Sequence, residues 1–143
     1  MKLFDRWRTP EVRADVGSGL WAAEAQSMQR ILRGTMTSAE RRLAAVPAQL
    51  HFAAGMDGRV VVLWRNTIAG FVPGDRAAEF RRQLADAGEA RLVADGEVRE
   101  HAGLWRVWVG HWPPAAVPEP PADEIAVEPT RILGIPLTGR GAP

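Results

Sequence analysis

The stretch "VVVLWRNTIAGFVPGDRAAEFRRQL", residues 60–84, is the most regularly patterned part of this chain. Its first strand, "RVVVLW" from residue 59, has the β-branched and aromatic side chains that are typical of a strand buried on both faces. "RNT" then turns the chain, because Asn66 tolerates a positive φ. "IAGFV", residues 68–72, returns as a second strand, in which Gly70 indicates a bulge or a close backbone approach.

A helix follows this pair of strands. Pro73 ends the second strand, and Asp75 is placed to cap the helix that begins there. Gly88 is expected to end the helix, because glycine adopts the conformation that terminates helices. The 3.6-residue period predicts that its buried face consists of Ala77, Phe80, Leu84 and Ala87.

Further strands flank this unit on both sides. "AQLHFAA", residues 48–54, places Leu50 and Phe52 on one face and His51 on the other, and "GMDG" turns the chain into the next strand. "EARLVADGEVRE" and "LWRVWVGHW" predict a hairpin around "HAG". One face of its second strand is predicted to carry Trp105, Val107 and Val109, and the other to carry Arg106, Trp108 and Trp112.

Two helices are predicted upstream of these strands. Ser18 is a residue type that commonly caps the start of a helix, and Gly34 is one that commonly ends it. Between them an apolar stripe at helical spacing consists of Trp21, Ala25, Met28 and Leu32. This amphipathic helix either packs against its own domain or docks on a partner. "TSAE", Thr37 to Glu40, is a capping box that opens a short helix stopped by Pro47, with Leu43 and Val46 inward.

The C-terminal part changes composition. Residues 113–129 hold six Pro and four acidic residues in 17 positions, which predicts an extended, polyproline-like linker. The following "RILGIPL" is apolar enough to add a strand to a sheet edge or to lie in a groove. Its candidate contact residues are Arg131, Ile132, Leu133, Ile135 and Leu137. The alternative for the whole tail is plain disorder.

The fold class expected from these patterns is α+β: a small, curled, antiparallel β-barrel-like sheet with one crossing helix, preceded by two N-terminal helices and followed by a Pro-rich tail. The expected divisions are an arm at residues 1–17, whose aromatic residues are Phe4 and Trp7, a helical segment at 18–47 and a β-rich core at 48–112. A Pro-rich acidic linker at 113–130 and an apolar tail motif at 131–143 complete the chain.

Charge and composition narrow the location and the partners. The 143 residues carry a net charge of only +1, so bulk charge favours no partner class. The 17 Arg against one Lys are explained more simply by a GC-rich genome, since Ala, Gly and Pro are abundant too, than by a phosphate-binding patch. The absence of Cys excludes disulfides and thiol catalysis. The N-terminus has no apolar run, so we expect no signal peptide, no membrane span and a cytoplasmic location.

Motifs for catalysis are missing from the sequence. His51, His101 and His111 have no metal-site spacing, and the serines have no nucleophile elbow around them. The glycines form neither "GxxxxGK" nor "GxGxxG". The sequence therefore predicts a protein that is not an enzyme and has no cofactor and no metal.

The opening stretch resembles the centre of a HIRAN domain. That family shows a strand of the type "AVAV", a short turn and a "VGYLP"-like strand that runs into an Ala-rich helix. Here Val60 to Leu63 match the first strand, Ile68 to Pro73 match the second with Phe71 at the aromatic place, and Arg76 to Phe80 match the helix start. The later hairpin fits the family's closing strands, so the resemblance covers about residues 48–112.

The resemblance implies a curled sheet crossed by a helix, and a role in nucleic-acid processing through capture of a single-stranded DNA 3′ end. The family uses a basic and aromatic groove and a loop of the type "PxNPYDPNAV". This chain has "AAGMDG" instead, in which Asp57 can stand in for the acidic residue. Because the chain has no Tyr, base stacking would use Trp or Phe.

Two functions follow as hypotheses. The first is a binding or regulatory module that has lost end capture and engages a protein partner through its tail or N-terminal helix. The second is single-strand binding, for which the candidates are Arg65, Trp64, Arg106, Trp108 and Trp112. The surface beside Trp108 separates them: an exposed Trp in a basic groove favours DNA, and a Trp covered by the chain itself favours a protein partner.

Overall fold

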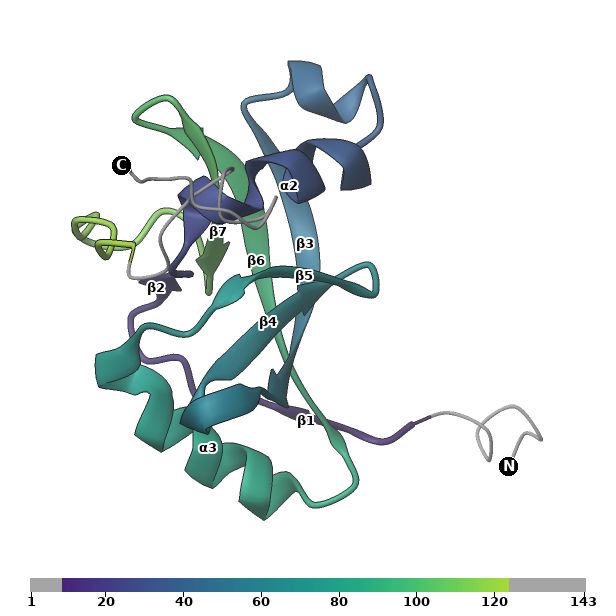
Figure 1. The fold of residues 1–143 in the computed structure, drawn as a ribbon, viewed down its shortest axis with the longest axis vertical. Coiled ribbons are helices and arrows are strands. Elements are labelled where there is room, and N and C mark those ends of the chain that lie inside the picture. Colours follow the sequence, from purple (N-terminus) through teal and green to yellow (C-terminus); the bar gives the residue numbers. More distant parts are fainter. Residues whose placement is uncertain (1–8, 124–143) are drawn as a thin grey trace, which may run out of the picture.

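Strands β4 (Val60–Trp64) and β5 (Thr67–Phe71) form the hairpin predicted from the opening stretch. The computed structural model describes residues 9–123, and Figure 1 shows them as one curled sheet with a helix near each of its two ends. The turn between the strands has φ of 52° at Arg65 and 63° at Asn66, the left-handed pair that a two-residue hairpin turn requires.

Five further strands, two α-helices and three short 3-10 turns complete the described part of the chain. The strands are β1 (Glu11–Arg13), β2 (Leu20–Trp21), β3 (Ala45–Ala54), β6 (Arg91–His101) and β7 (Leu104–Val109). The α-helices are α2 (Gln29–Thr35) and α3 (Gly74–Ala87). The 3-10 turns are η1 (Ala25–Met28), η2 (Glu40–Arg42) and η3 (Met56–Gly58).

The sheet is antiparallel along the order β2-β7-β6-β3-β4-β5. β1 pairs in parallel with the start of β6, so β1 and β7 share the edge of β6 that β3 leaves free. The predicted α+β class with a curled, barrel-like sheet is therefore confirmed. The sheet also takes in residues 11–13 and 20–21, which lie ahead of the core predicted to start at residue 48.

Backbone hydrogen bonds join the two ends of the curled sheet. The amide of Ala22 donates to the carbonyl of Val107 in β7 at 2.9 Å, and Ala23 exchanges hydrogen bonds with Phe71 in β5 at 2.6 and 3.2 Å. Gly70 permits this approach, because a Cβ at that position would lie 2.8 Å from the Cβ of Ala22. The pairing also shifts register beside Gly70, so both features predicted for this glycine occur.

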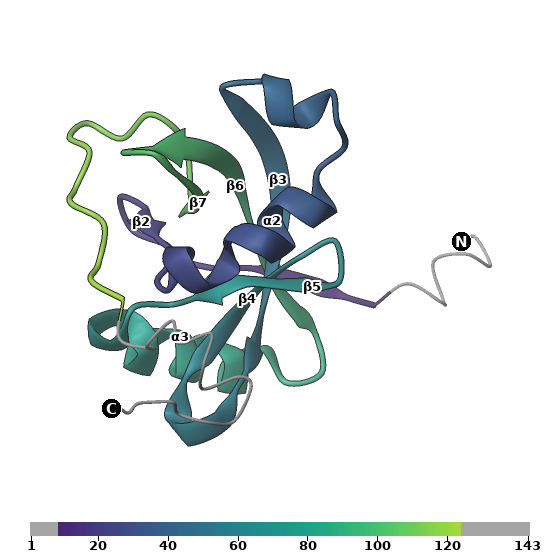
Figure 2. The same cartoon turned by 45° about the horizontal axis from the view of Figure 1, so that its top comes forward.

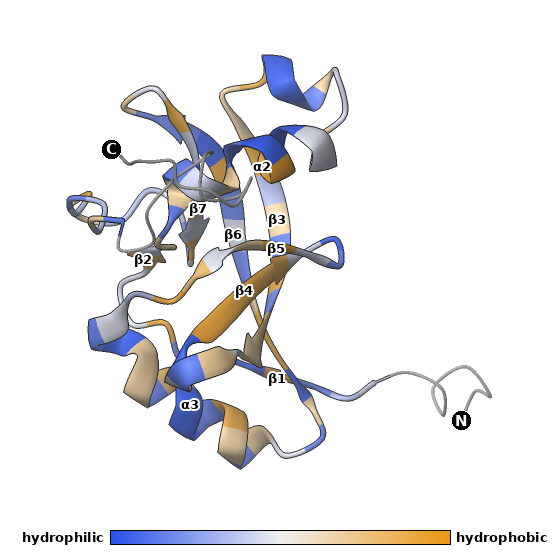
Figure 3. Cartoon of the chain, viewed as in Figure 1, coloured by the Kyte–Doolittle hydropathy of each residue, from blue (hydrophilic) through white to orange (hydrophobic). Residues whose placement is uncertain are grey.

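The core lies inside the curl and is closed at both ends by helices. Val60, Val62 and Val98 are completely buried, and β4 is strongly hydrophobic in Figure 3. α3 closes one end through Phe80, whose ring lies 5.1 Å from that of Phe52, while Leu32 of α2 belongs to the same core. Burying one such side chain stabilises the fold by about 1.5–3 kcal/mol.

The first predicted N-terminal helix is wrong in most of its length. The segment from Leu20 to Ala23 is extended and pairs with β7 and β5, and only Gln29–Thr35 forms an α-helix. Ser18 caps no helix and Gly34 lies inside α2. Two left-handed residues, Gly19 and Glu24, set the bends of this segment, and pairing with distant strands overrides its local helical pattern.

The second predicted helix is reduced to the turn η2. The capping box itself forms, since the Thr37 amide donates to Glu40 Oε1 at 2.9 Å and the Glu40 amide donates to Thr37 Oγ1 at 3.1 Å. Leu43, predicted inward, is 52% exposed, and Pro47 lies within β3 instead of stopping a helix. Helix α3 starts after Pro73, and Asp75 lies in its first turn without capping it.

Candidate functional site

Trp108 of β7 lies on the outer face of the sheet, yet none of its surface is exposed. Its neighbours along the strand, Val107 and Val109, point into the core, as the alternation of the strand predicts. A side chain of this size on the outer face needs a cover. The other aromatic residues of this face and a segment of the chain itself provide that cover.

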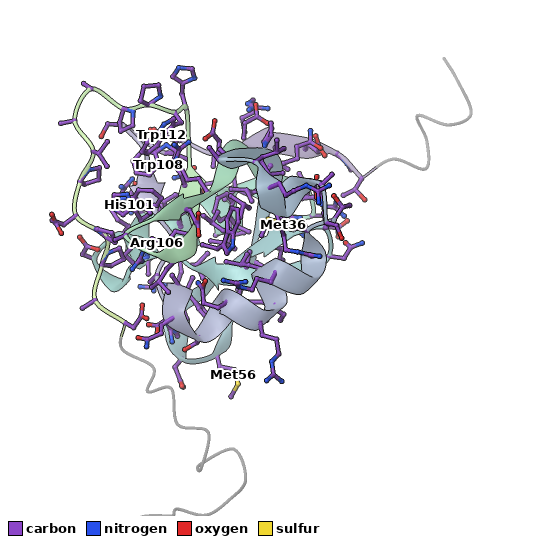
Figure 4. All side chains as sticks on the ribbon, turned by 90° about the horizontal axis from the view of Figure 1, so that it is seen from above. Met36, Met56, His101, Arg106, Trp108 and Trp112 are labelled. Carbon is purple, nitrogen blue, oxygen red and sulfur yellow. The ribbon has the colours of Figure 1, made fainter. Side chains whose placement is uncertain are left out.

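Four aromatic side chains gather on this face, and we call them the outer aromatic cluster: Trp21, His101, Trp108 and Trp112. Trp21 of β2 is the central member, with ring centroids 4.8 Å from His101, 5.0 Å from Trp108 and 5.6 Å from Trp112. Trp108 and Trp112 meet edge to face at 5.4 Å, an arrangement that aromatic pairs favour. Figure 4 shows His101, Trp108 and Trp112 on one side of the molecule.

Two cations of the hairpin accompany the cluster. The Arg99 guanidinium lies 4.1 Å above the Trp112 ring and pairs with Glu97 at 2.6 Å. Arg106 is the cross-strand neighbour of Arg99. Its Nε and Nη1 are shielded from solvent and have no hydrogen-bond partner in the described part of the chain. Buried donors are normally paired, so these two nitrogens of Arg106 are available to an additional acceptor on this face.

Residues 113–123, which we call the covering segment, run along this face (Figure 2). They have no helix or strand of their own. Trp21 Nε1 donates to the carbonyl of Pro118 at 3.0 Å, and the backbone amide of Gln26 donates to Asp123 Oδ2 at 3.1 Å. Pro120 and Pro121 are half-buried against the body. The predicted Pro-rich linker is thus attached to the domain up to residue 123.

Gln29 of α2 fixes the elements under the covering segment. Its side-chain amide donates to the Trp105 carbonyl at 2.7 Å and accepts from the Trp105 amide at 3.0 Å. This double contact imitates the pairing of a neighbouring strand and occupies the edge of β7 beyond β2. The turn η1, which contains Gln26, is therefore held beside β7, where Asp123 reaches it.

Arg65 and Trp64 lie elsewhere, at the turn between β4 and β5. β3 and β6 separate them from β7, so they share no groove with Arg106 and Trp108. Arg65 forms a two-pronged pair with Glu40 at 2.7 and 2.8 Å and stacks 4.4 Å above the Trp64 ring. Hydrogen bonding to Arg65 is the largest cause that lowers the pKa of Glu40 to about 2. Glu40 thereby neutralises this cation.

A groove of about 360 Å³ runs over the outer face of β3 next to this turn. It is polar and partly basic, and its lining includes Gln49, His51, Arg65, Asn66 and Arg91. Burial is the first cause that lowers the pKa of His51 below its usual value, and the neighbouring Arg91 lowers it further. Both causes disfavour the charged form of His51, whereas Glu11, which also lines the groove, acts in the opposite direction.

Asp57 and Phe71 mark a third place, near the start of α3. A hollow of about 350 Å³ is lined by Asp57, Arg59 and Arg81, among others. The Arg59 guanidinium lies 4.0 Å above the Phe71 ring and 3.4 Å from Glu24, a fully buried carboxylate. These contacts tie the segment ahead of α2 to β4 and β5.

The candidates thus fall into three separate groups. The structure brings Arg106, Trp108 and Trp112 together, as the sequence predicted, and it separates them from Arg65 and Trp64 and from Asp57 and Phe71. Trp21, His101 and Arg99 were missed as members of the site. The five tail residues from Arg131 to Leu137, like Phe4 and Trp7, lie outside the described residues.

Within residues 9–123, no three metal-binding side chains lie close enough to hold an ion, and neither helix has the length and apolarity needed to cross a membrane. Comparison of the chain with protein-family models, with curated proteins and with solved structures finds no match.

Proposed function

We propose that this chain is a non-catalytic, HIRAN-like binding module that engages a protein partner. The observation that carries the proposal is the complete burial of Trp108 under the chain's own residues. Stacking on single-stranded bases requires an aromatic face that is open to solvent. The rings of the outer aromatic cluster pack against one another, and the covering segment is bonded to Trp21. The acidic residues of that segment, Glu119 and Asp123, would repel phosphate.

The distribution of the cations supports the same function. Arg65 is bound by Glu40, Arg99 is bound by Glu97 and Arg59 is bound by Glu24. Cations that already have carboxylate partners form a weak phosphate track, since each must first exchange its partner. Interfaces between proteins, by contrast, are enriched in Trp and Arg, the two residue types that gather around β7.

Quantitative affinity capture with the full-length chain tests this function. Extract from the source organism is treated with nuclease, and the wild type is compared with Ile132→Asp/Leu133→Asp and with Trp112→Ala. Arg82→Ala, an exposed change on α3, is the matched control. We expect one captured protein whose amount is unchanged by nuclease treatment and is the same with the wild type and with the control. With at least one of the other two variants its captured amount should fall at least fivefold. Equal capture by all four chains would contradict the proposal.

Single-strand binding is the second candidate function, and the groove over β3 favours it. Arg91, which is exposed, lines this groove together with polar side chains, the carboxylate of Glu11 and Arg65, which is paired with Glu40. The test is fluorescence anisotropy of a single strand with a free 3′ end at low and moderate salt, with a 3′-phosphorylated strand and a blunt duplex as controls. Salt-sensitive binding that requires the free end and weakens in Arg91→Ala would support this candidate. No binding at low salt would exclude it.

A further inference from the structure

We propose that the outer aromatic cluster is a binding site for proline-rich protein segments, and that the chain's own residues 117–123 occupy it as a built-in ligand. This inference rests on the proposed protein-binding function and names the chemistry of the partner. The described contacts of the covering segment provide the argument, because they show how a proline-rich stretch lies on this face.

The hydrogen bond from Trp21 is the first observation. Proline has no N–H, so a proline-rich segment offers only carbonyl acceptors and apolar rings to a partner. Aromatic-lined surfaces recognise such segments by packing against the rings. Here an indole N–H from a cluster of three Trp and one His donates to the carbonyl of Pro118 at 3.0 Å. The cluster thus supplies both the aromatic surface and the donor.

The sequence of the built-in segment is the second observation. "VPEPPAD", residues 117–123, contains a proline pair three positions apart, Pro118 and Pro121, which is the spacing of proline-rich ligands. Pro120 and Pro121 are half-buried, while Pro118, Ala115 and Ala116 are exposed. The contact is therefore made by the carbonyl of Pro118, which accepts from Trp21, and by the half-buried residues Pro120 and Pro121.

Incomplete pairing is the third observation. Arg106 Nε and Nη1, Ser27 Oγ and Asp123 Oδ1 are shielded and have no hydrogen-bond partner in the described part of the chain. A segment that belonged permanently to the core would satisfy such groups. A proline-rich ligand that carries a carboxylate within reach of Arg106 would satisfy that donor and could displace the built-in segment.

Competition within the chain predicts the behaviour of the wild type. A tethered segment acts at an effective concentration on the order of millimolar, so an added peptide binds only weakly until the tethered copy is weakened. Pro120→Ser/Pro121→Ser removes the two half-buried rings. The matched control is Ala115→Ser/Ala116→Ser, which changes the exposed part of the same segment.

The experiment titrates each full-length chain with a labelled peptide of residues 113–123 and follows anisotropy. We expect Pro120→Ser/Pro121→Ser to bind the peptide about tenfold more tightly than the wild type or the control does. Adding Trp21→Phe, which keeps a ring but removes the donor, should weaken that binding about fivefold. Equal binding by all chains, or no effect of Trp21→Phe, would overturn the inference.

A second measurement covers the case in which a variant fails to fold. The wild type has six Trp, so a ¹⁵N spectrum with excess unlabelled peptide can follow each indole N–H. In Pro120→Ser/Pro121→Ser we expect the Trp21 and Trp112 signals to leave their wild-type positions and to return when the peptide is added, while the Trp64 signal stays and shows that the core is folded; signals that do not return would overturn the inference. A chain that captures a protein partner but ignores the peptide refutes this inference alone. Binding to DNA without any captured protein refutes the proposed function itself.

Discussion

Strand β7 has two buried aromatic faces, and they are buried in different ways. On the inner face Trp105 is 4% exposed among side chains from β3, β4, β6 and two helices. On the outer face Trp108 is just as inaccessible, but its neighbours there are the rings of Trp21 and Trp112, Gly19 and the carbonyl of His111, and the covering segment is bonded to Trp21. Two side chains that are equally buried can therefore differ in the free energy needed to expose them to solvent. A core made by many elements opens only when the domain unfolds, whereas one segment can open alone.

The largest expected effect lies on the inner side. Phe80→Ala removes a fully buried ring that contacts Phe52 and leaves a cavity between α3 and the sheet. We expect it to lower the free energy of unfolding by about 3–5 kcal/mol in urea denaturation. Ile68→Ala, at a position that is 40% exposed, is the control and should change it by about 0.5 kcal/mol or less. Similar losses in both variants would contradict the described core.

Gly96→Ala tests the connection between the two faces. A Cβ at residue 96 would collide with the backbone carbonyl oxygen of Trp108, so β6 and β7 would have to separate. We expect a loss of about 1–3 kcal/mol and a changed near-ultraviolet signal from the outer aromatic cluster. Gly34→Ala, which meets no atom within 4 Å, should be neutral or slightly stabilising. A Gly96→Ala variant with unchanged stability would contradict the described pairing of β6 with β7.

Trp112→Ala probes the outer side alone. Because Trp112 is half-buried and touches Arg99 and two other Trp, we expect a smaller loss of about 1–2 kcal/mol. Thermal unfolding followed by far-ultraviolet circular dichroism should still show one cooperative transition. A loss as large as that of Phe80→Ala would mean that the two faces form a single core.

The smallest effect concerns the turn opposite the cluster and depends on pH. The pKa of Glu40 is depressed to about 2, so its carboxylate stabilises the fold above the unfolded pKa near 4.5, and this stabilisation is lost as the pH falls toward 2. We expect Glu40→Gln to melt below the wild type at pH 6 and together with it at pH 2. A constant difference across this range would show that the pairs with Arg65 and Thr37 carry no pH dependence.

The strand–turn–strand–helix unit could be predicted because its signals are local. Val60 to Trp64 are β-prone, Asn66 takes the positive φ of the turn, and Phe80 lies on the apolar face of α3. The segment around Trp21 could not be predicted in the same way. Its helical spacing is real, but its pairing partner in β7 lies more than 80 positions along the chain.

Only part of the candidate site could be predicted from the sequence. The alternation of β7 placed Trp108 on the outer face, as found, because a strand has a fixed period of two. Trp112 lies beyond the end of β7 and meets Trp108 after the bend at Gly110. Trp21 joined them only through its pairing with β7, and the covering segment through a hydrogen bond between Trp21 and Pro118, which no local pattern records. The available signal was the coexistence of several Trp with a proline-rich stretch in one chain.

The central claim is that the cover over the outer aromatic cluster opens separately from the core. Hydrogen exchange tests this most directly, by comparing the Trp21 indole N–H, which binds Pro118, with the backbone amides of β3 and β6 at low urea concentrations. We predict that the indole N–H exchanges with a lower opening free energy that does not depend on urea, while the strand amides follow global unfolding. The same opening free energy and the same dependence on urea for both would contradict the account.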